Sequence, residues 1–319
     1  MSLLPPVAMS TSSRGTKALG LLTLVSAVLT ILYSFWFSKA DVELGNTVRI
    51  LYVHVPTVSI AYLCMLVNAG ASAFYLWKRT AFPDLLAAAT GEIGVLLLGL
   101  TILAGMMWGK PTWGTFWEWG DPRLTSTLLL FLMYLGYVTV RNIPAPRSAR
   151  NTRSAVIGII SALLIYPVKM STEWWGSLHQ GRTISALGAS KIHGAQEFAL
   201  YSGFLTFMLF AAWLTIHRFR VGWLQDQADA TELDAVASYH LARAEADEGM
   251  TFAERAMKSD PTCWTCAETG ARLHFLRGEV EEAVTVQMRA IAAMPERAVD
   301  QRALSVLRRY QEAARSKGP

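Results

Sequence analysis

Six long apolar runs constrain the fold of this 319-residue chain more than any other feature. A helix needs about 20 predominantly apolar residues to cross the hydrocarbon core of a bilayer, and each run has roughly that length. Charged residues make up 17% of the chain, against about 25% in a typical soluble domain. The first run has no small-x-small cleavage site after it, so it is not typical of a cleaved signal peptide. We therefore predict an all-α protein with a six-helix transmembrane bundle, its spans at 18–38, 50–77, 85–108, 124–140, 154–170 and 193–216.

The basic residues predict which ends of the spans face the cytoplasm. Lysine and arginine are enriched in the cytoplasmic loops of membrane proteins, and four segments on one side of the predicted bundle carry a modest excess of them. These residues are Arg14, Lys17, Lys78, Arg79, Arg141, Arg147, Arg150, Arg153, Arg218 and Arg220. We therefore predict that both termini are cytoplasmic, with 1–17 as a short cytoplasmic segment, and that 108–126 faces outward.

Three aromatic segments meet at the outward face of the predicted bundle. They are "RILYVHVPTVSIAY" with His54, "WGKPTWGTFWEWGDPRLTS" at 108–126, and "STEWWGSLHQGRTIS" with His179. Ionisable side chains near membrane depth are costly and indicate function. Two histidines and the tryptophans of these segments at one depth therefore predict a binding site.

The residue types of these segments match the needs of a haem. Imidazole nitrogens are axial ligands of haem iron, and His54 and His179 come from separate segments that can approach a porphyrin from opposite faces. Indole rings offer flat apolar surface at low entropic cost. We expect Asp121 to hold the loop in shape or to orient a histidine. Cations for the haem propionates are available in the same segments, at Arg49, Lys110, Arg123 and Arg182.

Simpler explanations stay open for single residues. Tryptophan is enriched where helices leave the bilayer, so any one of these rings can be an interfacial anchor. His54 alone is explained as well by an ordinary interfacial histidine as by a ligand. His193 is a weaker third ligand candidate. The remaining histidines fall on the inner side and are expected to be ordinary; they are His217, His240 and His274.

Three motifs together resemble a known family. "WGTFWEWGDPRLTS" resembles the WWD signature of membrane proteins that handle haem in cytochrome c maturation. "YVHVP" and "EWWGSLHQG" resemble the CcmC (haem exporter protein C) members of that group, over about residues 18–220. The resemblance implies that His54 and His179 ligate the iron of haem b. It implies that the haem edge is bound by Trp113, Trp117, Trp119 and Asp121. Gly120 departs from the family pattern, which usually has tryptophan directly before the aspartate. The further haem-binding candidates of the same segments are Trp108, Arg123, Trp174 and Trp175.

The resemblance also implies a carrier role and no enzymatic activity. CcmC-like proteins hold haem at the outer face of the bacterial cytoplasmic (inner) membrane, with the WWD loop in the periplasm. They load it onto a CcmE-like haem chaperone, beside a CcmA/CcmB-type ABC transporter and a CcmD-like small membrane protein, and these are the expected partners besides membrane lipid. Because such a site must bind haem and then release it, we expect its ligands on mobile loops and not inside helices.

Residues 221–319 differ in character from the spans. They are rich in alanine and in charge, contain most of the acidic residues, and have a helical period. Pro261 and Pro295 lie 34 positions apart, as do Ala256 and Ala290, and about 34 residues is the tetratricopeptide period. We predict a cytoplasmic tetratricopeptide-like extension that docks an unknown cytoplasmic protein. A helical cap without a partner is the simpler alternative, and the CcmC resemblance implies nothing about this part, because that pattern usually ends soon after the last span.

The extension also contains a "CWTC" motif, with Cys263 and Cys266. No histidine follows it, no second pair completes a zinc site, and no βαβ pattern surrounds it, so it matches neither a c-type haem attachment site nor a thioredoxin-like site. Thiols stay reduced in the cytoplasm, and the spacing places both on one helix face. We therefore expect two reduced, packed thiols, and a third packed thiol at Cys64 within the second span.

Three other functions are weighed against the carrier. An electron-transfer cytochrome would need histidine pairs at both depths, and only His217 lies at the inner edge. A haem-attachment synthetase of the larger WWD type carries more spans and more outward histidines. An assembly scaffold without its own haem would use the tryptophan loop to dock proteins. The net charge of +5 follows from the basic loops, so we expect no nucleic-acid partner.

Overall fold

The structure is a computed structural model that describes residues 11–179, 194–295, 299 and 301–316. Every regular element within these residues is an α-helix, which confirms the predicted all-α class. The chain divides into two compact units, Met1–Arg220 and Val221–Pro319.

Among the described residues, six helical segments are long and apolar enough to cross a membrane, as predicted. They are α1 (Arg14–Trp36), α2 (Val48–Lys78), α3 (Ala81–Trp113), α4 (Pro122–Asn142), the pair α5 (Arg147–Leu163) and α6 (Ile165–Trp174), and α7 (Ala195–Ala242). Most begin or end a few residues outside the predicted apolar runs, because polar residues can continue a helix where it leaves the apolar layer.

The fifth span is two helices instead of one. Pro167 has no backbone N–H, so it cannot bond to the carbonyl of Leu163 four residues earlier. Helix α5 ends at that residue, and the N–H of Leu164 bonds to Ser161 in a tighter turn, at 3.1 Å. This break separates α6, whose last residue lies close in sequence to the predicted ligand His179.

Helix α7 is longer than the sixth predicted span. It continues from Ala195 to Ala242 over 48 residues without a proline. The boundary between the two compact units, at Arg220 and Val221, therefore falls inside a helix.

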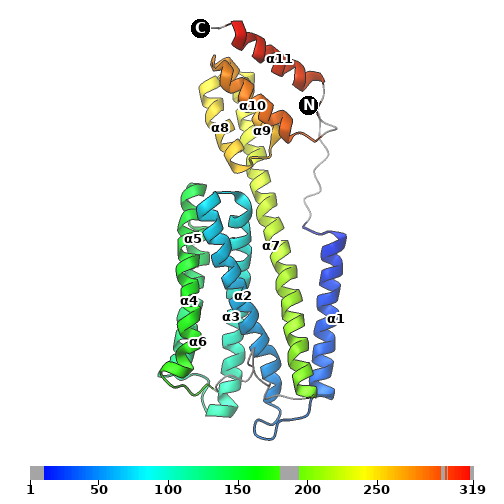
Figure 1. Cartoon of the computed structure of the whole chain (residues 1–319), viewed down its shortest axis with the longest axis vertical. Helices are drawn as coiled ribbons and strands as arrows, with labels where there is room; N and C mark the ends of the chain where they lie inside the picture. The colour runs from blue at the N-terminus through cyan, green and yellow to red at the C-terminus, as the bar shows by residue number, and fades with distance from the viewer. Residues whose placement is uncertain (1–10, 180–193, 296–298, 300, 317–319) are drawn as a thin grey trace. The chain divides into compact units, whose positions relative to one another are not determined.

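The first unit packs around a core between α2, α3, α4, α5 and α6, which Figure 1 shows side by side, and the first part of α7 contributes Ala211 to the same core. Its largest fully buried side chains include Tyr134, Tyr137, Met65 and Leu97. The hydroxyl of Tyr134 donates to the carbonyl of Met65 at 3.1 Å, which ties α4 to α2. Helix α1 lies against the first part of α7 (Figure 1), where the hydroxyls of Ser26 and Thr206 are hydrogen-bonded at 2.7 Å.

A buried ion pair joins α3 to α4 at the end of the bundle away from the tryptophan loop. Both guanidinium Nη atoms of Arg141 donate to the carboxylate of Asp84, at 2.9 and 2.7 Å. The exposed fractions of the two side chains are 11% and 3%. In the same unit Arg218 of α7 donates to Glu92 of α3. These two acidic residues of α3 are therefore paired.

The second unit repeats one helical hairpin. It comprises the end of α7 and then α8 (Ala246–Ser259), α9 (Trp264–Leu276), α10 (Val280–Ala293) and α11 (Gln301–Ser316). His240 pairs with Glu245 at 2.8 Å, and His274, 34 positions later, pairs with Glu279 at 2.6 Å. Ala244 and Gly278 occupy matching turns with positive φ, at 59° and 80°. The hairpins thus follow the 34-residue period, and their assignment as tetratricopeptide-like stays a prediction.

The expected reduced state of the CWTC thiols is wrong for this structure. Cys263 and Cys266 are joined by a disulfide across one turn at the start of α9. The expected packing holds for Cys266, which is fully buried. Cys64 is a free, buried thiol in α2, as expected.

Candidate functional site

All three predicted segments come together at one end of the first unit. The start of α2, the end of α3, the start of α4 and the end of α6 lie at the same end of the bundle, which is the lower end in Figure 1. Because successive spans alternate in direction, segments separated by more than a hundred residues share this end.

His54 lies in the second turn of α2 and is held by α3. Its Nδ1 is 3.0 Å from the carbonyl oxygen of Thr101. A carbonyl only accepts hydrogen bonds, so Nδ1 carries the proton and Nε2 of the neutral ring keeps a free lone pair. The hydroxyl of Thr101 donates to that of Thr57 at 3.0 Å and fixes the two helices together at this level. His54 is therefore an oriented imidazole inside a helix, and the expectation that both ligands lie on loops is wrong for it.

Gly105 of α3 makes room for the His54 ring. A methyl group on Gly105 would lie 3.1 Å from Cε1 and 3.6 Å from Nδ1 of His54. Any larger side chain there must displace the imidazole or move α3 away from α2.

We therefore predict that Gly105→Val tilts His54 off the Thr101 carbonyl. For the haem site expected from the sequence, this lowers haem retention in purified protein by roughly tenfold, which corresponds to about 1.4 kcal/mol. The matched control is Gly136→Val in α4, where a methyl group would meet nothing within 4 Å. Absorbance spectra of the two purified variants measure the effect. Equal haem content in both would show that His54 does not need this space.

His179 faces His54 across the end of the bundle. The centroids of the two rings are 6.3 Å apart, and their planes make an angle of 36°. Two imidazoles that each bind one metal ion through a bond of about 2 Å have ring centres about 6 Å apart. Trp113, the last residue of α3, has its ring centroid 6.4 Å from that of His179. The two predicted ligands thus lie at a separation that suits one metal ion between them.

The tryptophan loop is shaped by its small and polar residues. Gly114 ends α3 with φ of 79°, in the left-handed region that favours glycine. The hydroxyl of Thr115 donates to the carbonyl of Trp117 at 2.9 Å, and Thr125 donates to the carbonyl of Trp119 at 2.8 Å. The glycines and hydroxyls between the rings therefore bend the chain back to Asp121.

Asp121 connects this loop to the His179 segment. Its Oδ1 accepts the backbone N–H groups of Arg123 and Leu124 at 2.9 and 3.0 Å, which caps the N-terminus of α4. Its Oδ2 accepts the Ser177 hydroxyl and the Leu178 N–H, both at 2.7 Å. The N–H of His179 in turn donates to the Ser177 hydroxyl oxygen at 3.0 Å. One carboxylate thus starts α4 and positions the segment that carries His179.

The hydrogen bonds keep Asp121 ionised. Burial opposes the charge, but the donors of Ser177, Leu124, Leu178 and Arg123 outweigh it and hold the pKa of the carboxyl below its ordinary value. A group with a lowered pKa contributes stability above its ordinary pKa, and loses it as the pH falls through the lowered value. The hydrogen bonds that the Asp121 carboxylate accepts are therefore at full strength at neutral pH and weaken only in acid, below about pH 4.

Besides Trp113, the tryptophans of the three predicted segments divide into three groups. Trp108 is 8% exposed and contributes to a small apolar core. Its partners there are Val48, Leu51, Tyr52, Ala199 and Leu200. Trp117 and Trp119 meet edge to face at 5.8 Å. The indole N–H of Trp117 is buried and has no hydrogen-bond partner among the described residues. Trp174 and Trp175 are exposed and meet edge to face at 5.4 Å.

The predicted cations have protein partners of their own. Arg123, at the start of α4, donates to the carbonyls of Val168 and Lys169 in α6, at 3.0 and 3.4 Å. Lys110 donates to the carbonyl of Gly114 at 3.0 Å. Arg49 lies over the ring of Phe35. Arg182 and His193 lie outside the described residues.

Three residues that shape the candidate site are not apparent from the sequence. Thr101, Gly105 and Ser177 contact His54 or the Asp121 connection. A glycine within the apolar run of α3 was the only signal, since the threonine and the serine are ordinary for their positions.

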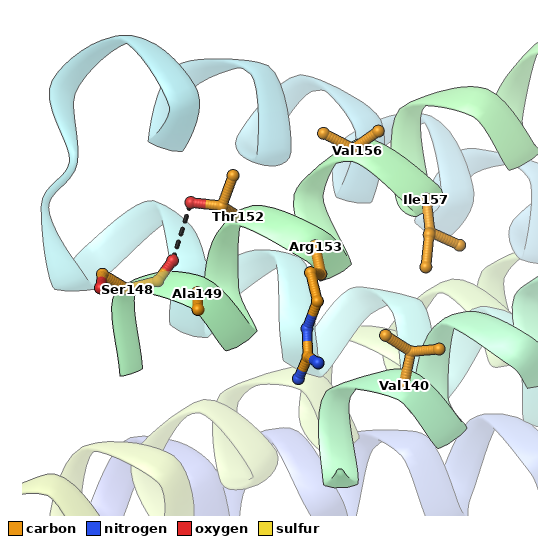
Figure 2. A pocket seen from close by; sticks show the side chains of 7 residues that line it. All are labelled: Val140, Ser148, Ala149, Thr152, Arg153, Val156 and Ile157. Carbon is orange, nitrogen blue, oxygen red and sulfur yellow. Dashed lines mark hydrogen bonds between the residues drawn. The ribbon is translucent and has the colours of Figure 1, made fainter. Parts of the chain in front are cut away.

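A separate cleft of about 650 Å³ lies between the last turn of α4 and the first part of α5. Figure 2 shows Val140 of α4 facing Arg153, Val156 and Ile157 of α5 across it. None of its lining residues belongs to the predicted site. Two of the polar side chains within the spans have protein partners, since Asn68 donates to the carbonyl of Ala87 and Glu92 pairs with Arg218.

Fold and site together define a multi-pass helical membrane protein with two facing imidazoles beside a tryptophan-rich loop. The family model described as Heme exporter protein C matches residues 3–234. The chain belongs to this family, CcmC, which confirms the resemblance seen in its motifs.

Individual relatives match between 50% and 68% of this chain. The Heme exporter protein C of Haemophilus influenzae is 33% identical over 218 residues, which is 68% of this chain and 87% of the relative. The protein of the same name from Bradyrhizobium diazoefficiens is 37% identical over 162 residues, 50% of this chain and 61% of the relative. That of Escherichia coli K12 is 32% identical over 197 residues, 60% of this chain and 78% of the relative.

Proposed function

We propose that this protein binds haem b between His54 and His179 and presents it at the outer face of the cytoplasmic membrane during cytochrome c maturation. The observation that carries the proposal is the 6.3 Å separation of the two ring centroids. The names of the relatives, which speak of haem export, support the same function.

The donor set fits a porphyrin better than a bare metal ion. Among the described residues, no group of three or more His, Cys, Asp or Glu side chains is placed to hold a metal ion. Two imidazoles alone leave most coordination positions of iron open, and the four nitrogens of a porphyrin fill them. The unpaired N–H of Trp117 is a donor available to a carboxylate of the ligand. Trp113 beside His179 offers a flat apolar surface for the macrocycle.

The two ligands differ in rigidity, and this difference suits a carrier. His54 is fixed inside α2 by the Thr101 carbonyl. His179 lies beyond the end of α6 and is positioned through Ser177 and Asp121. Helices are stiffer than connecting segments, so we propose that His54 retains the iron while the His179 segment moves to admit and release haem. Hydrogen exchange showing 175–179 as protected as α2, with and without haem, would contradict this division.

Absorption spectroscopy of purified protein in detergent tests the ligands. Wild type is expected to carry haem with the spectrum of a six-coordinate bis-histidine iron. His54→Ala and His179→Ala should each lose one axial ligand, with a changed Soret band and a loss of bound haem of about tenfold or more. The control is His217→Ala, at the other end of the bundle.

The outcomes separate the candidate functions. Haem that is perturbed by both site variants and not by the control supports the carrier. Haem that neither variant changes would place the ligands elsewhere. A wild type that takes up no haem after supplementation would favour an assembly scaffold. Covalent attachment of haem to an apocytochrome by the purified protein alone would favour a synthetase over a carrier.

The partners and the orientation belong to the same proposal. We propose a multi-pass protein of the bacterial inner membrane, with both termini in the cytoplasm and the WWD loop in the periplasm, because the basic residues favour that orientation. Delivery is to a CcmE-like chaperone, beside CcmA, CcmB and CcmD-like components and membrane lipid. The helical hairpins of the second unit dock a cytoplasmic protein.

A further inference from the structure

The cysteine pair of the second unit lies at the N-terminus of a helix. Cys263 is the N-cap of α9, and its Sγ accepts the backbone N–H of Cys266 at 3.2 Å. The disulfide joins this N-cap to the first turn of the same helix. The partial positive charge of a helix N-terminus and a donated N–H both favour a thiolate over a thiol. The sulfur of Cys263 is therefore in a setting that activates it as a nucleophile and as a leaving group.

The two sulfurs differ sharply in access. Cys266 is 0% exposed and is enclosed by Ala230 of α7 and Ala256 of α8. Cys263 is only partly buried, at the edge of the same cluster. An external molecule can therefore reach Cys263, whereas Cys266 is reached only from Cys263.

The disulfide closes only a short loop, so its contribution to the stability of the fold is small. The disulfide spans a sequence separation of 3, so it removes little chain entropy from the unfolded state, since that effect grows with loop length. A bond that adds little stability, at an activated and accessible position, matches an exchangeable disulfide better than a structural one.

From this asymmetry we propose that Cys263 and Cys266 form a redox-active dithiol that reduces disulfides by thiol–disulfide exchange. The Cys263 thiolate attacks one sulfur of a substrate disulfide, which forms a mixed disulfide and releases the other substrate sulfur as a thiolate. The Cys266 thiolate then attacks Cys263 Sγ, closes the internal disulfide and releases the second substrate thiolate. Two electrons pass from the dithiol to the substrate, and the two protons of the original thiols end on the products.

The substrate class is a disulfide, from a small thiol such as glutathione or from a protein. The proposal shares no residue with the haem site, so either can fail without the other.

The experiment uses the full chain in detergent in a Cys64→Ala background, which leaves only this pair of cysteines. The reduced protein is mixed with glutathione disulfide or with insulin as a protein disulfide, quenched with a maleimide, and analysed by peptide mass spectrometry. We expect the wild-type pair to close its internal disulfide and to reopen with dithiothreitol while the helical circular dichroism is unchanged. Oxidation by glutathione disulfide alone would assign a small-thiol substrate, and oxidation by insulin as well would include proteins.

Two variants separate the roles of the sulfurs. Cys266→Ser should trap one mixed disulfide per chain on Cys263, at a rate at least about tenfold above that of Cys266 in the Cys263→Ser variant. Equal rates, or a reduced wild-type pair that stays reduced in excess glutathione disulfide, would overturn the proposal. If the serine variants do not fold, the reversible cycle of the wild-type pair decides: a cycle with intact helices supports exchange, and its absence refutes it.

Discussion

An Asp121→Ala variant is expected to lose haem and stability together. The Asp121 carboxylate both caps the N-terminus of α4 and holds the segment that carries His179. Removal of an aspartate N-cap costs about 0.5–2 kcal/mol. The N–H of Leu178 and the hydroxyl of Ser177 lose their acceptor as well, and a hydrogen bond to a charged group contributes about 1.5–3 kcal/mol. Together we expect a loss of about 2–4 kcal/mol. Because His179 is positioned through Ser177, haem retention should fall by at least about tenfold.

Asp121→Asn distinguishes the two roles. An amide oxygen in the place of Oδ1 still accepts the N–H groups of Arg123 and Leu124, so the cap of α4 survives. The amide nitrogen then faces the Leu178 N–H, and two donors cannot bond to each other. We expect the asparagine variant to keep most of its thermal stability and still to lose haem. If it retains haem at the wild-type level, the connection from Asp121 to the His179 segment is not required for binding.

The second large effect is expected when one partner of the buried ion pair between Asp84 and Arg141 is removed. Asp84→Ala leaves the Arg141 guanidinium, 11% exposed, without its carboxylate. Breaking a buried pair by removing one partner costs about 3–5 kcal/mol. For a folding unit of the size of Met1–Arg220, a loss of about 3 kcal/mol lowers the melting temperature by roughly 6–12 °C. The exposure of Cys64 to a thiol-reactive dye on heating measures it, since this thiol is buried in α2.

A double variant shows whether the unpaired charge is the cause. Asp84→Ala with Arg141→Met removes both charges and should recover most of the lost stability, because an apolar replacement of a buried pair is often neutral. The exposed pair of Arg243 and Glu245 in the second unit is the matched surface control, where little change in stability is expected because solvent screens the two charges. A double variant as unstable as Asp84→Ala alone would point to a lost packing contact instead.

Most of the fold of the first unit is predictable from the sequence, and the reason is the solvent. In lipid every backbone polar group must be paired within the protein, so a long apolar run has to be a helix. The break at Leu164 was not predicted although Pro167 is visible in the sequence, because prolines are tolerated within membrane helices. The continuation of α7 to Ala242 was missed because the change in composition near Val221 was interpreted as the end of the element.

The candidate site was predicted in outline, as segments that share one end of the bundle, and its binding of haem stays a prediction. Its two histidines and the loop between α3 and α4 are visible as motifs. The burial of Trp108 was missed, since a tryptophan at a helix end looks the same in sequence whether it packs inward or faces a ligand. The disulfide between Cys263 and Cys266 was also missed, because the expectation of reduced thiols depended on the compartment and not on the local geometry.

The sequence alone determined that this is a membrane bundle whose histidine and tryptophan segments share one end, because apolar length and alternation of spans require it. The tertiary structure decided that His54 and His179 face each other at 6.3 Å, that Asp121 connects the loop to the His179 segment, and that Gly105 leaves space for an imidazole. These contacts join residues far apart in the chain, and they depend on helix packing and side-chain rotamers that no local pattern encodes.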